Sequence, residues 1–206
     1  MEVLRNDMVR QPQPRIGQGS TAPSRNGPSS WFAILLALIG GLVPGSAAEP
    51  ASESSLRAVL IYRFTTLAQF PAASFASPEA PIRIVVLGSD PVFEPLRKLV
   101  ADKKLAGRPI EVSTTTSPDV AAEGLVVYVA PSAAASTDAL LKQTQEKPVL
   151  SIGSVGAFCA KGGMIAIFRK EQKLDYDINA DAVQRAAQKG IQLNPIVFKV
   201  GKTVRD

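Results

Sequence analysis

Short apolar runs rich in β-branched residues alternate with longer amphipathic segments through most of this chain. Each run has the length of one strand and is too short for a buried helix. The segments between the runs repeat apolar residues at helical spacing, and strands joined by helices lie parallel with right-handed crossovers. The sequence therefore predicts an α/β fold, a three-layer sandwich with a mostly parallel central sheet and helices on both faces. In chain order the expected elements are strand 82–88, helix 91–100, strand 110–115, helix 118–123, strand 125–130, helix 132–145 and strand 148–152.

Further elements flank this alternating pattern. Two runs over 162–168 and 174–178, separated by a polar turn, predict a C-terminal β-hairpin at the edge of the sheet. A helix is expected over 181–189, and Asn194 is expected to cap a final short helix. A helix over 54–70 should precede the first strand, because apolar residues recur there every three or four positions. Its expected core face comprises Leu56, Val59, Leu60, Phe64, Leu67 and Phe70.

The first part of the chain does not resemble a folded domain. Residues 1–30 are polar and contain four arginines, the apolar segment 31–44 follows, and small residues lead to Ala48. This order is typical of a secretory signal peptide, and the apolar segment is short for a helix that spans a bilayer. We expect residues 1–48 to be a cleaved signal peptide and 49–206 to form a single α/β domain. The alternative is an N-terminal segment retained as an anchor.

The composition argues against several classes of protein. The 206 residues include no histidine and one cysteine, Cys159, so the usual general base of a Ser-His-Asp site is missing and no intramolecular disulfide can form. The net charge of +5 decreases without residues 1–48, and no aromatic residues interleave with the lysines, so we expect no nucleic-acid partner. A binding protein, or an enzyme that uses Asp, Glu, Lys or Ser alone, fits this composition.

Two short patterns suggest ligand sites but lack the residues that those sites require. The acids of 175–181 alternate like the start of a calcium loop, yet Ala180 and Ala186 stand where the glycine and the bidentate glutamate are needed. The glycines of 153–163 match no phosphate-binding fingerprint, so turns and bulges are their expected roles. We therefore expect no metal and no cofactor. Cys159 is expected to be a small buried residue, with an exposed reactive thiol as the alternative.

Five short motifs occur in an order and at spacings that allow comparison with known families. They are Tyr62 and Phe64 with Phe70-Pro71, Val86-Leu-Gly88 with Pro91, Gly107-Arg-Pro109, Gly156-Ala-Phe158 with Gly162-Gly-Met-Ile165, and Tyr176-Asp-Ile-Asn179. Together these motifs resemble the YfiR family over nearly all of residues 53–201. The resemblance implies a small periplasmic α/β protein that regulates by binding and is not an enzyme.

The best-studied role in that family is docking on the periplasmic sensor domain of a membrane-bound diguanylate cyclase, which represses the cyclase and lowers cyclic di-GMP and biofilm formation. The resemblance therefore implies a homodimer whose partner is such a cyclase or a sensor kinase. It also implies a partner-binding surface at Cys159, Ala160, Asp177 and Val183. Ala166 stands where some members have the redox partner of the cysteine. From the residues alone, Val183 fits a helix core face equally well, and Asp177 fits a solvated strand position.

Two other classes of function stay open. A soluble periplasmic sensor would bind a small molecule beyond the carboxyl ends of the parallel strands, near 88–90 and 131–132. An enzyme would rely on Asp90 with Lys98 or Ser89, but no convergent set of groups accompanies them, and we expect no catalytic residues.

Overall fold

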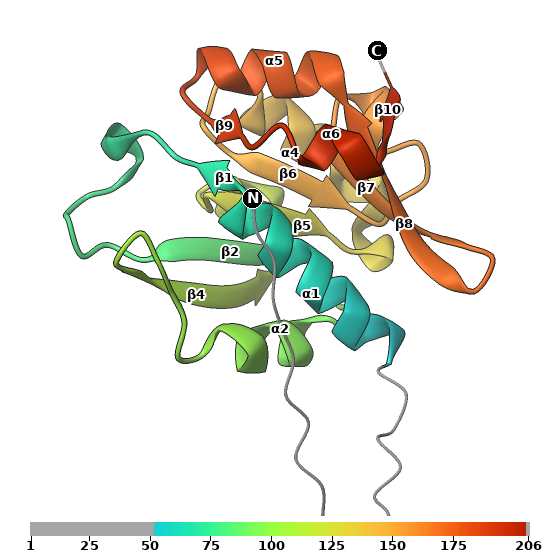
Figure 1. Cartoon of the computed structure of the whole chain (residues 1–206), viewed down its shortest axis with the longest axis horizontal. Coiled ribbons are helices and arrows are strands. Elements are labelled where there is room, and N and C mark those ends of the chain that lie inside the picture. The colour runs from blue at the N-terminus through green and yellow to red at the C-terminus, as the bar shows by residue number, and fades with distance from the viewer. Residues whose placement is uncertain (1–51, 205–206) are drawn as a thin grey trace, which may run out of the picture. The chain divides into compact units, whose positions relative to one another are not determined.

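The computed structural model describes residues 52–204, which contain one eight-stranded sheet (Figure 1). Five of its seven strand pairings are parallel, which confirms the predicted α/β class. From one edge to the other the strands are β10 (Lys202–Val204), β8 (Lys173–Asn179), β7 (Ile165–Lys170), β6 (Leu150–Gly153), β5 (Val126–Val129), β2 (Ile82–Leu87), β4 (Arg108–Thr115) and β3 (Lys104–Leu105).

The predicted signal peptide, residues 1–48, lies outside the described residues. Within 52–204, no helix combines the length and the apolar character that crossing a membrane requires.

Helices cover both faces of the sheet, as the sequence predicts. Two separate clusters of buried apolar side chains lie between the sheet and these helices, one on each face. The central strand β5 is accordingly buried on both sides, and its four side chains are 0% exposed. The helices on one face are α1 (Glu53–Thr66), α2 (Phe93–Val100), α5 (Ala180–Gln188) and α6 (Val197–Val200), and those on the other are α3 (Pro118–Ala121) and α4 (Thr137–Thr144).

The first helix is shorter than predicted and turns a different side toward the core. It ends at Thr66, because β1 (Ala68–Gln69) pairs antiparallel with β9 (Gln192–Leu193) in a separate small sheet. Leu56 and Val59 were expected in the core, but each is 47% exposed. This prediction was wrong because aliphatic residues occur around most of the helix, so their spacing does not define one face. The buried residues are Ala58, Ile61, Phe64 and Thr65.

The predicted hairpin consists of β7 and β8, which pair antiparallel from Ile165 with Ile178 to Lys170 with Lys173. One more strand lies beyond it, because the three-residue β10 pairs parallel with β8. A strand this short has no recognisable periodicity, so the sequence did not indicate it. The hairpin therefore occupies this end of the sheet with one short strand outside it.

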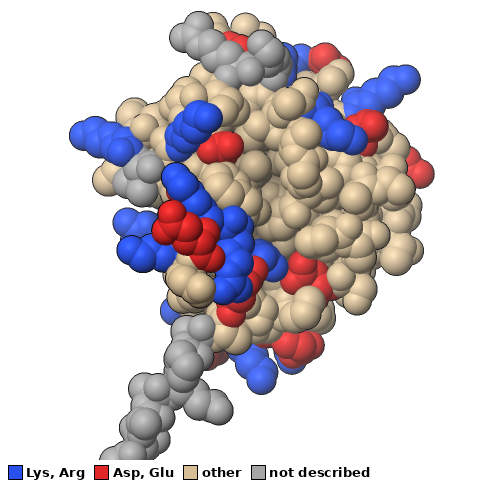
Figure 2. All heavy atoms as spheres, turned by 90° about the vertical axis from the view of Figure 1, so that its right-hand side faces the viewer, with Lys and Arg blue, Asp and Glu red and all other residues tan. Residues whose placement is uncertain are grey.

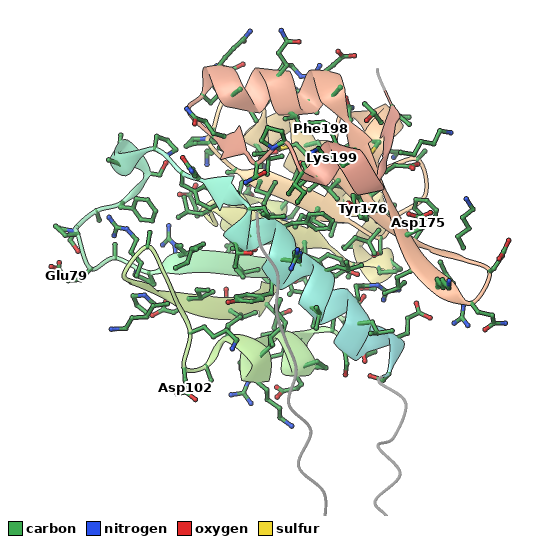
Figure 3. All side chains as sticks on the ribbon, in the orientation of Figure 1. Glu79, Asp102, Asp175, Tyr176, Phe198 and Lys199 are labelled. Atoms are coloured by element: carbon green, nitrogen blue, oxygen red, sulfur yellow. The ribbon has the colours of Figure 1, made fainter. Side chains whose placement is uncertain are left out.

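Tyr176 connects the hairpin to the helices that follow. Its hydroxyl donates to the Val197 carbonyl at 3.2 Å, and its ring meets Phe64 edge-on at 4.9 Å between centroids. Figure 3 shows Tyr176 on β8 below Phe198 and Lys199 of α6. These contacts explain how the predicted short helix near Asn194 is held against the sheet.

Two glycines of the 153–163 cluster pack against one buried ring. Phe158 is 1% exposed, and a Cβ atom on Gly153 or Gly163 would lie 2.5 or 2.2 Å from its ring. Gly162, with φ of +93°, has the turn role that the sequence predicts. Gly153 and Gly163 must be glycine, because any side chain there would occupy the space of the Phe158 ring.

We expect Gly163→Ala to lower the free energy of unfolding by about 2 kcal/mol, because the new methyl group overpacks the Phe158 ring. Urea unfolding measures this change. Gly156→Ala is the matched control, since a Cβ there meets nothing within 4 Å. In a Phe158→Leu background the cost of Gly163→Ala should decrease, and an unchanged cost would contradict the packing explanation.

Candidate functional site

A cavity of about 440 Å³ lies beyond the carboxyl end of β6. It forms because β6 ends at Gly153, paired with Ala166, whereas β7 and β8 continue past that point as a hairpin. The loop after β6, the short 3₁₀ helix η3 (Cys159–Lys161) and the side of α1 enclose the remaining space. Its polar and small wall residues include Arg57, Ser154, Cys159, Ala160, Arg169 and Asp177.

Three polar atoms in the cavity wall are buried and have no hydrogen-bond partner among the described residues. They are Arg57 Nε, Ser154 Oγ and Asp177 Oδ1. The serine oxygen lies near the Tyr128 hydroxyl, but their geometry does not meet that of a hydrogen bond. An unsatisfied buried polar group costs about 1–3 kcal/mol, so water, a ligand or a partner side chain is expected to satisfy these atoms. Together they offer donors and an acceptor within one small space.

Ion pairs hold the Arg57 side chain at the cavity. Glu53 Oε1 lies 2.5 Å from Arg57 Nη2, and the second oxygen of Glu53 lies 2.7 Å from Arg169 Nη1. Arg57 and Arg169 line the cavity, so the Glu53 carboxylate positions both guanidinium groups. Figure 2 shows the side of the molecule where basic and acidic side chains gather in this way. Exposed pairs of this kind add little stability, so we assign them a positioning role.

Arg57 also reaches a buried carboxylate at the end of β2. Its Nη1 atom lies 4.0 Å from Asp90 Oδ2, and the Asp90 side chain is 3% exposed. The carboxylate accepts hydrogen bonds from the Val92 N–H at 2.8 Å and the Tyr128 hydroxyl at 3.2 Å. Burial raises the pKa of Tyr128 well above its ordinary value. Asp90 is therefore committed to structural bonds, which does not favour a role in acid–base chemistry.

Asn179 fixes the loop that contains Cys159. Its amide nitrogen donates to the Cys159 carbonyl at 2.7 Å, while its Oδ1 accepts from the Ala182 N–H and caps α5. The Cys159 thiol is buried, as expected, and lies 3.6 Å from the Asp177 carbonyl oxygen. One buried amide thus connects η3, β8 and the start of α5.

Three of the four predicted partner-binding residues lie together. Cys159, Ala160 and Asp177 all line the cavity, and Ala160 is exposed. Val183 is on α5, half-buried, and packs against the core cluster instead. The structure thus brings the neighbouring Cys159 and Ala160 together with the distant Asp177 at one site, whereas Val183 fits the core role that the residues alone allowed.

The predicted small-molecule site at the ends of β2 and β5 is bridged by a side chain. Ser132 Oγ accepts from the Ser89 N–H at 2.9 Å and donates to the Ser89 carbonyl at 2.8 Å. A Cβ atom on Gly88 would lie 2.6 Å from the same hydroxyl, so the two loops approach closely. The cavity is farther along the sheet, next to β7.

Arg57 and Ser154 were not predicted as site residues. Arg57 lies in a helix whose core face we misassigned, and its ionic partners are Glu53 of the same helix and the distant Asp90. Ser154 follows the strand that we predicted over 148–152. Because ligands of α/β sheets bind beyond the carboxyl ends of the strands, the sequence could have indicated this residue.

The fold and the cavity define an α/β domain with an open site at the carboxyl ends of its parallel strands, where polar groups are set among apolar side chains. The sequence profile of the YfiR/HmsC-like family matches residues 54–202, and the chain belongs to that family. Among solved structures, the chain is similar to a conserved domain protein from Vibrio cholerae O1 biovar El Tor, with a TM-score of 0.50 and 14% identity. The match covers 75% of this chain and 60% of that one, and it supports the fold alone. No curated protein matches the chain.

We expect Tyr128→Phe to change the pH dependence of stability. Because the pKa of Tyr128 is raised above its ordinary 10.0, only the unfolded state ionises just above that pH. The stabilisation by neutral Tyr128 is complete below pH 10.0 and is lost as pH rises toward the folded-state pKa. The variant should lose about 1 kcal/mol near neutral pH, from the missing hydrogen bond, and decline less steeply in alkali. Urea unfolding at several pH values tests this, and parallel pH profiles would contradict it.

Proposed function

We propose that this protein is a periplasmic regulator, exported by an N-terminal signal peptide, that docks on the periplasmic domain of a membrane signalling protein. Its family membership supports a regulatory role. The partner is a diguanylate cyclase or a sensor kinase, and with a cyclase, docking represses the enzyme and lowers cyclic di-GMP. The protein itself has no catalytic role in this proposal.

The proposed docking site is the cavity, and its lining supports the proposal. Cys159, Ala160 and Asp177 line it together with buried polar atoms that lack partners in the described chain. A partner side chain that enters the cavity can accept from Arg57 Nε and donate to Asp177 Oδ1 once these two side chains turn toward it. Such bonds form away from water, where satisfying a polar group matters most for affinity. The fixed position of η3 means that little ordering is needed on docking.

We expect Ala160→Trp to abolish docking, because an indole at this exposed wall position blocks access to the cavity. The tagged protein would be captured from detergent-solubilised membranes of its native cell and its partners identified by mass spectrometry. The wild type should recover one membrane protein with a periplasmic domain and a cytoplasmic cyclase or kinase module. The variant should recover none of it, and with a cyclase partner, cellular cyclic di-GMP should increase severalfold.

Ala139→Trp is the matched control, since Ala139 is also exposed but lies on α4, away from the cavity wall. It should capture the partner as the wild type does, and both variants should unfold at similar urea concentrations. Undiminished capture by Ala160→Trp would contradict the proposed docking site.

A second candidate function is sensing a small molecule in the same cavity. Its volume of about 440 Å³ lies within the range of ligand sites, and its free donors and acceptor suit a polar molecule. A compound that binds should raise the unfolding midpoint, with a gain of about 2.7 kcal/mol at a hundredfold excess over Kd. Asp177→Asn should abolish the shift caused by that compound.

As a control, the same compound library is screened by thermal shift on the wild type and on Asp177→Asn, and the shifts of the two proteins are compared. Compounds that stabilise both proteins equally bind elsewhere. A screen in which no compound depends on Asp177 would contradict the sensor function and leave docking as the role of the cavity.

A further inference from the structure

A second hollow lies at the amino ends of the parallel strands, at the opposite end of the sheet from the cavity. Its volume is about 570 Å³. Ile82, at the start of β2, and Ala68 of β1 are its most buried wall residues, 2% and 5% exposed. The rest of the wall comes from loop 70–81, which joins β1 to β2, and from the end of α1 and the turn between β3 and β4 (Figure 1). We call this hollow the Phe75 pocket.

Most of the wall is apolar and only partly covered by the rest of the chain. Phe70, Phe75 and Leu105 pack against the larger core cluster, yet each is half-buried and lines the pocket. Covering apolar surface of this kind with an apolar molecule is favourable. Sites for small molecules typically combine such a wall with a few polar groups that fix the orientation of the ligand.

One cation lies in this apolar wall. Arg108 is the single charged residue that lines the pocket. Its guanidinium carbon lies 3.7 Å from the centroid of the Phe75 ring, and Nη1 donates to the carbonyls of Ser77 at 2.8 Å and Ala80 at 3.0 Å. These contacts hold the guanidinium and the loop in place before a ligand arrives, so little ordering is needed on binding.

The guanidinium keeps donors for a ligand. Among the described residues, Arg108 forms its hydrogen bonds through Nη1, and no acid forms an ion pair with it. The one acid of loop 70–81, Glu79, lies at the outer tip of the loop (Figure 3). Nε and Nη2 lie along one edge of a guanidinium, the arrangement that binds both oxygens of a carboxylate.

We propose that the Phe75 pocket binds an amphipathic anion, an apolar molecule that carries one carboxylate, of which a medium-chain fatty acid is the simplest case. The apolar part covers Phe70, Phe75 and Leu105, and the carboxylate pairs with Arg108. A single arginine balances one negative charge, which favours a carboxylate over a doubly charged phosphate. The pocket has the size and the mainly apolar wall of a small-molecule site.

This site is independent of the proposed docking site. Two of the short sequence motifs, Phe70-Pro71 and Gly107-Arg-Pro109, each place a residue in its wall, and the docking proposal uses neither. Loop 70–81 and the β7–β8 hairpin beside the cavity lie on opposite sides of the domain (Figure 1). Ala160→Trp should therefore bind a fatty acid as the wild type does, so the two proposals can fail separately.

Isothermal titration calorimetry of the purified protein with decanoate, below the concentration at which decanoate forms micelles, tests the proposal. Decanol is the uncharged control. We expect decanoate to bind more tightly than decanol by about tenfold or more, because only decanoate pairs with Arg108. Nuclear Overhauser effects between the decanoate chain and the methyl groups of Ile82 and Leu105 should place the ligand in the pocket.

Two neighbouring alanines provide a matched pair of variants. Both are exposed in the short 3₁₀ helix η1 (Ala72–Ser74), but Ala72 lines the pocket and Ala73 does not. Ala72→Trp fills the entrance and should increase the Kd for decanoate about tenfold or more. Ala73→Trp should leave the Kd unchanged, and both variants should unfold at the same urea concentration as the wild type.

Arg108→Met tests the charge. This variant should bind decanoate and decanol with similar affinity, and urea unfolding checks that it still folds without the bonds to Ser77 and Ala80. Several results would overturn the proposal: no binding of decanoate to the wild type, equal binding of decanol, or undiminished binding by Ala72→Trp. A protein whose capture from membranes is lost in Ala72→Trp, while decanoate fails to bind the wild type, would overturn it in favour of a second protein-docking site.

Discussion

Burial of the central strands on both faces is the constraint on which the rest of this structure depends. The four side chains of β5 are fully buried, so the chain must place helices on each side of the sheet. The strands β2, β5 and β6 run parallel, so the loops that follow them lie at the same end of the sheet. Asp90, Ser132 and Ser154 therefore lie in loops at one end of the sheet, although they are far apart in the sequence.

The unequal length of neighbouring strands makes a site at this end. β6 stops at Gly153, where the Phe158 ring occupies the space against the backbone, while the hairpin continues. Asn179 ties the intervening loop to α5, and Glu53 holds two arginines at the cavity. The cavity is therefore lined by groups whose positions the core determines, and its unsatisfied atoms are held in place for an occupant.

The sequence predicted the elements whose periodicity is strong, and missed those that depend on tertiary contact. β2 and β5 are continuous apolar runs, and Ser117 caps α3 as its position before proline indicates. The predicted core face of α1 was wrong, because the exposed Leu56 and Val59 are as apolar as the residues that are buried. β1, β9 and β10 are two or three residues long and exist only through their partners. In the site, the resemblance indicated Cys159, Ala160 and Asp177, but only the crossing of α1 brings Arg57 to them.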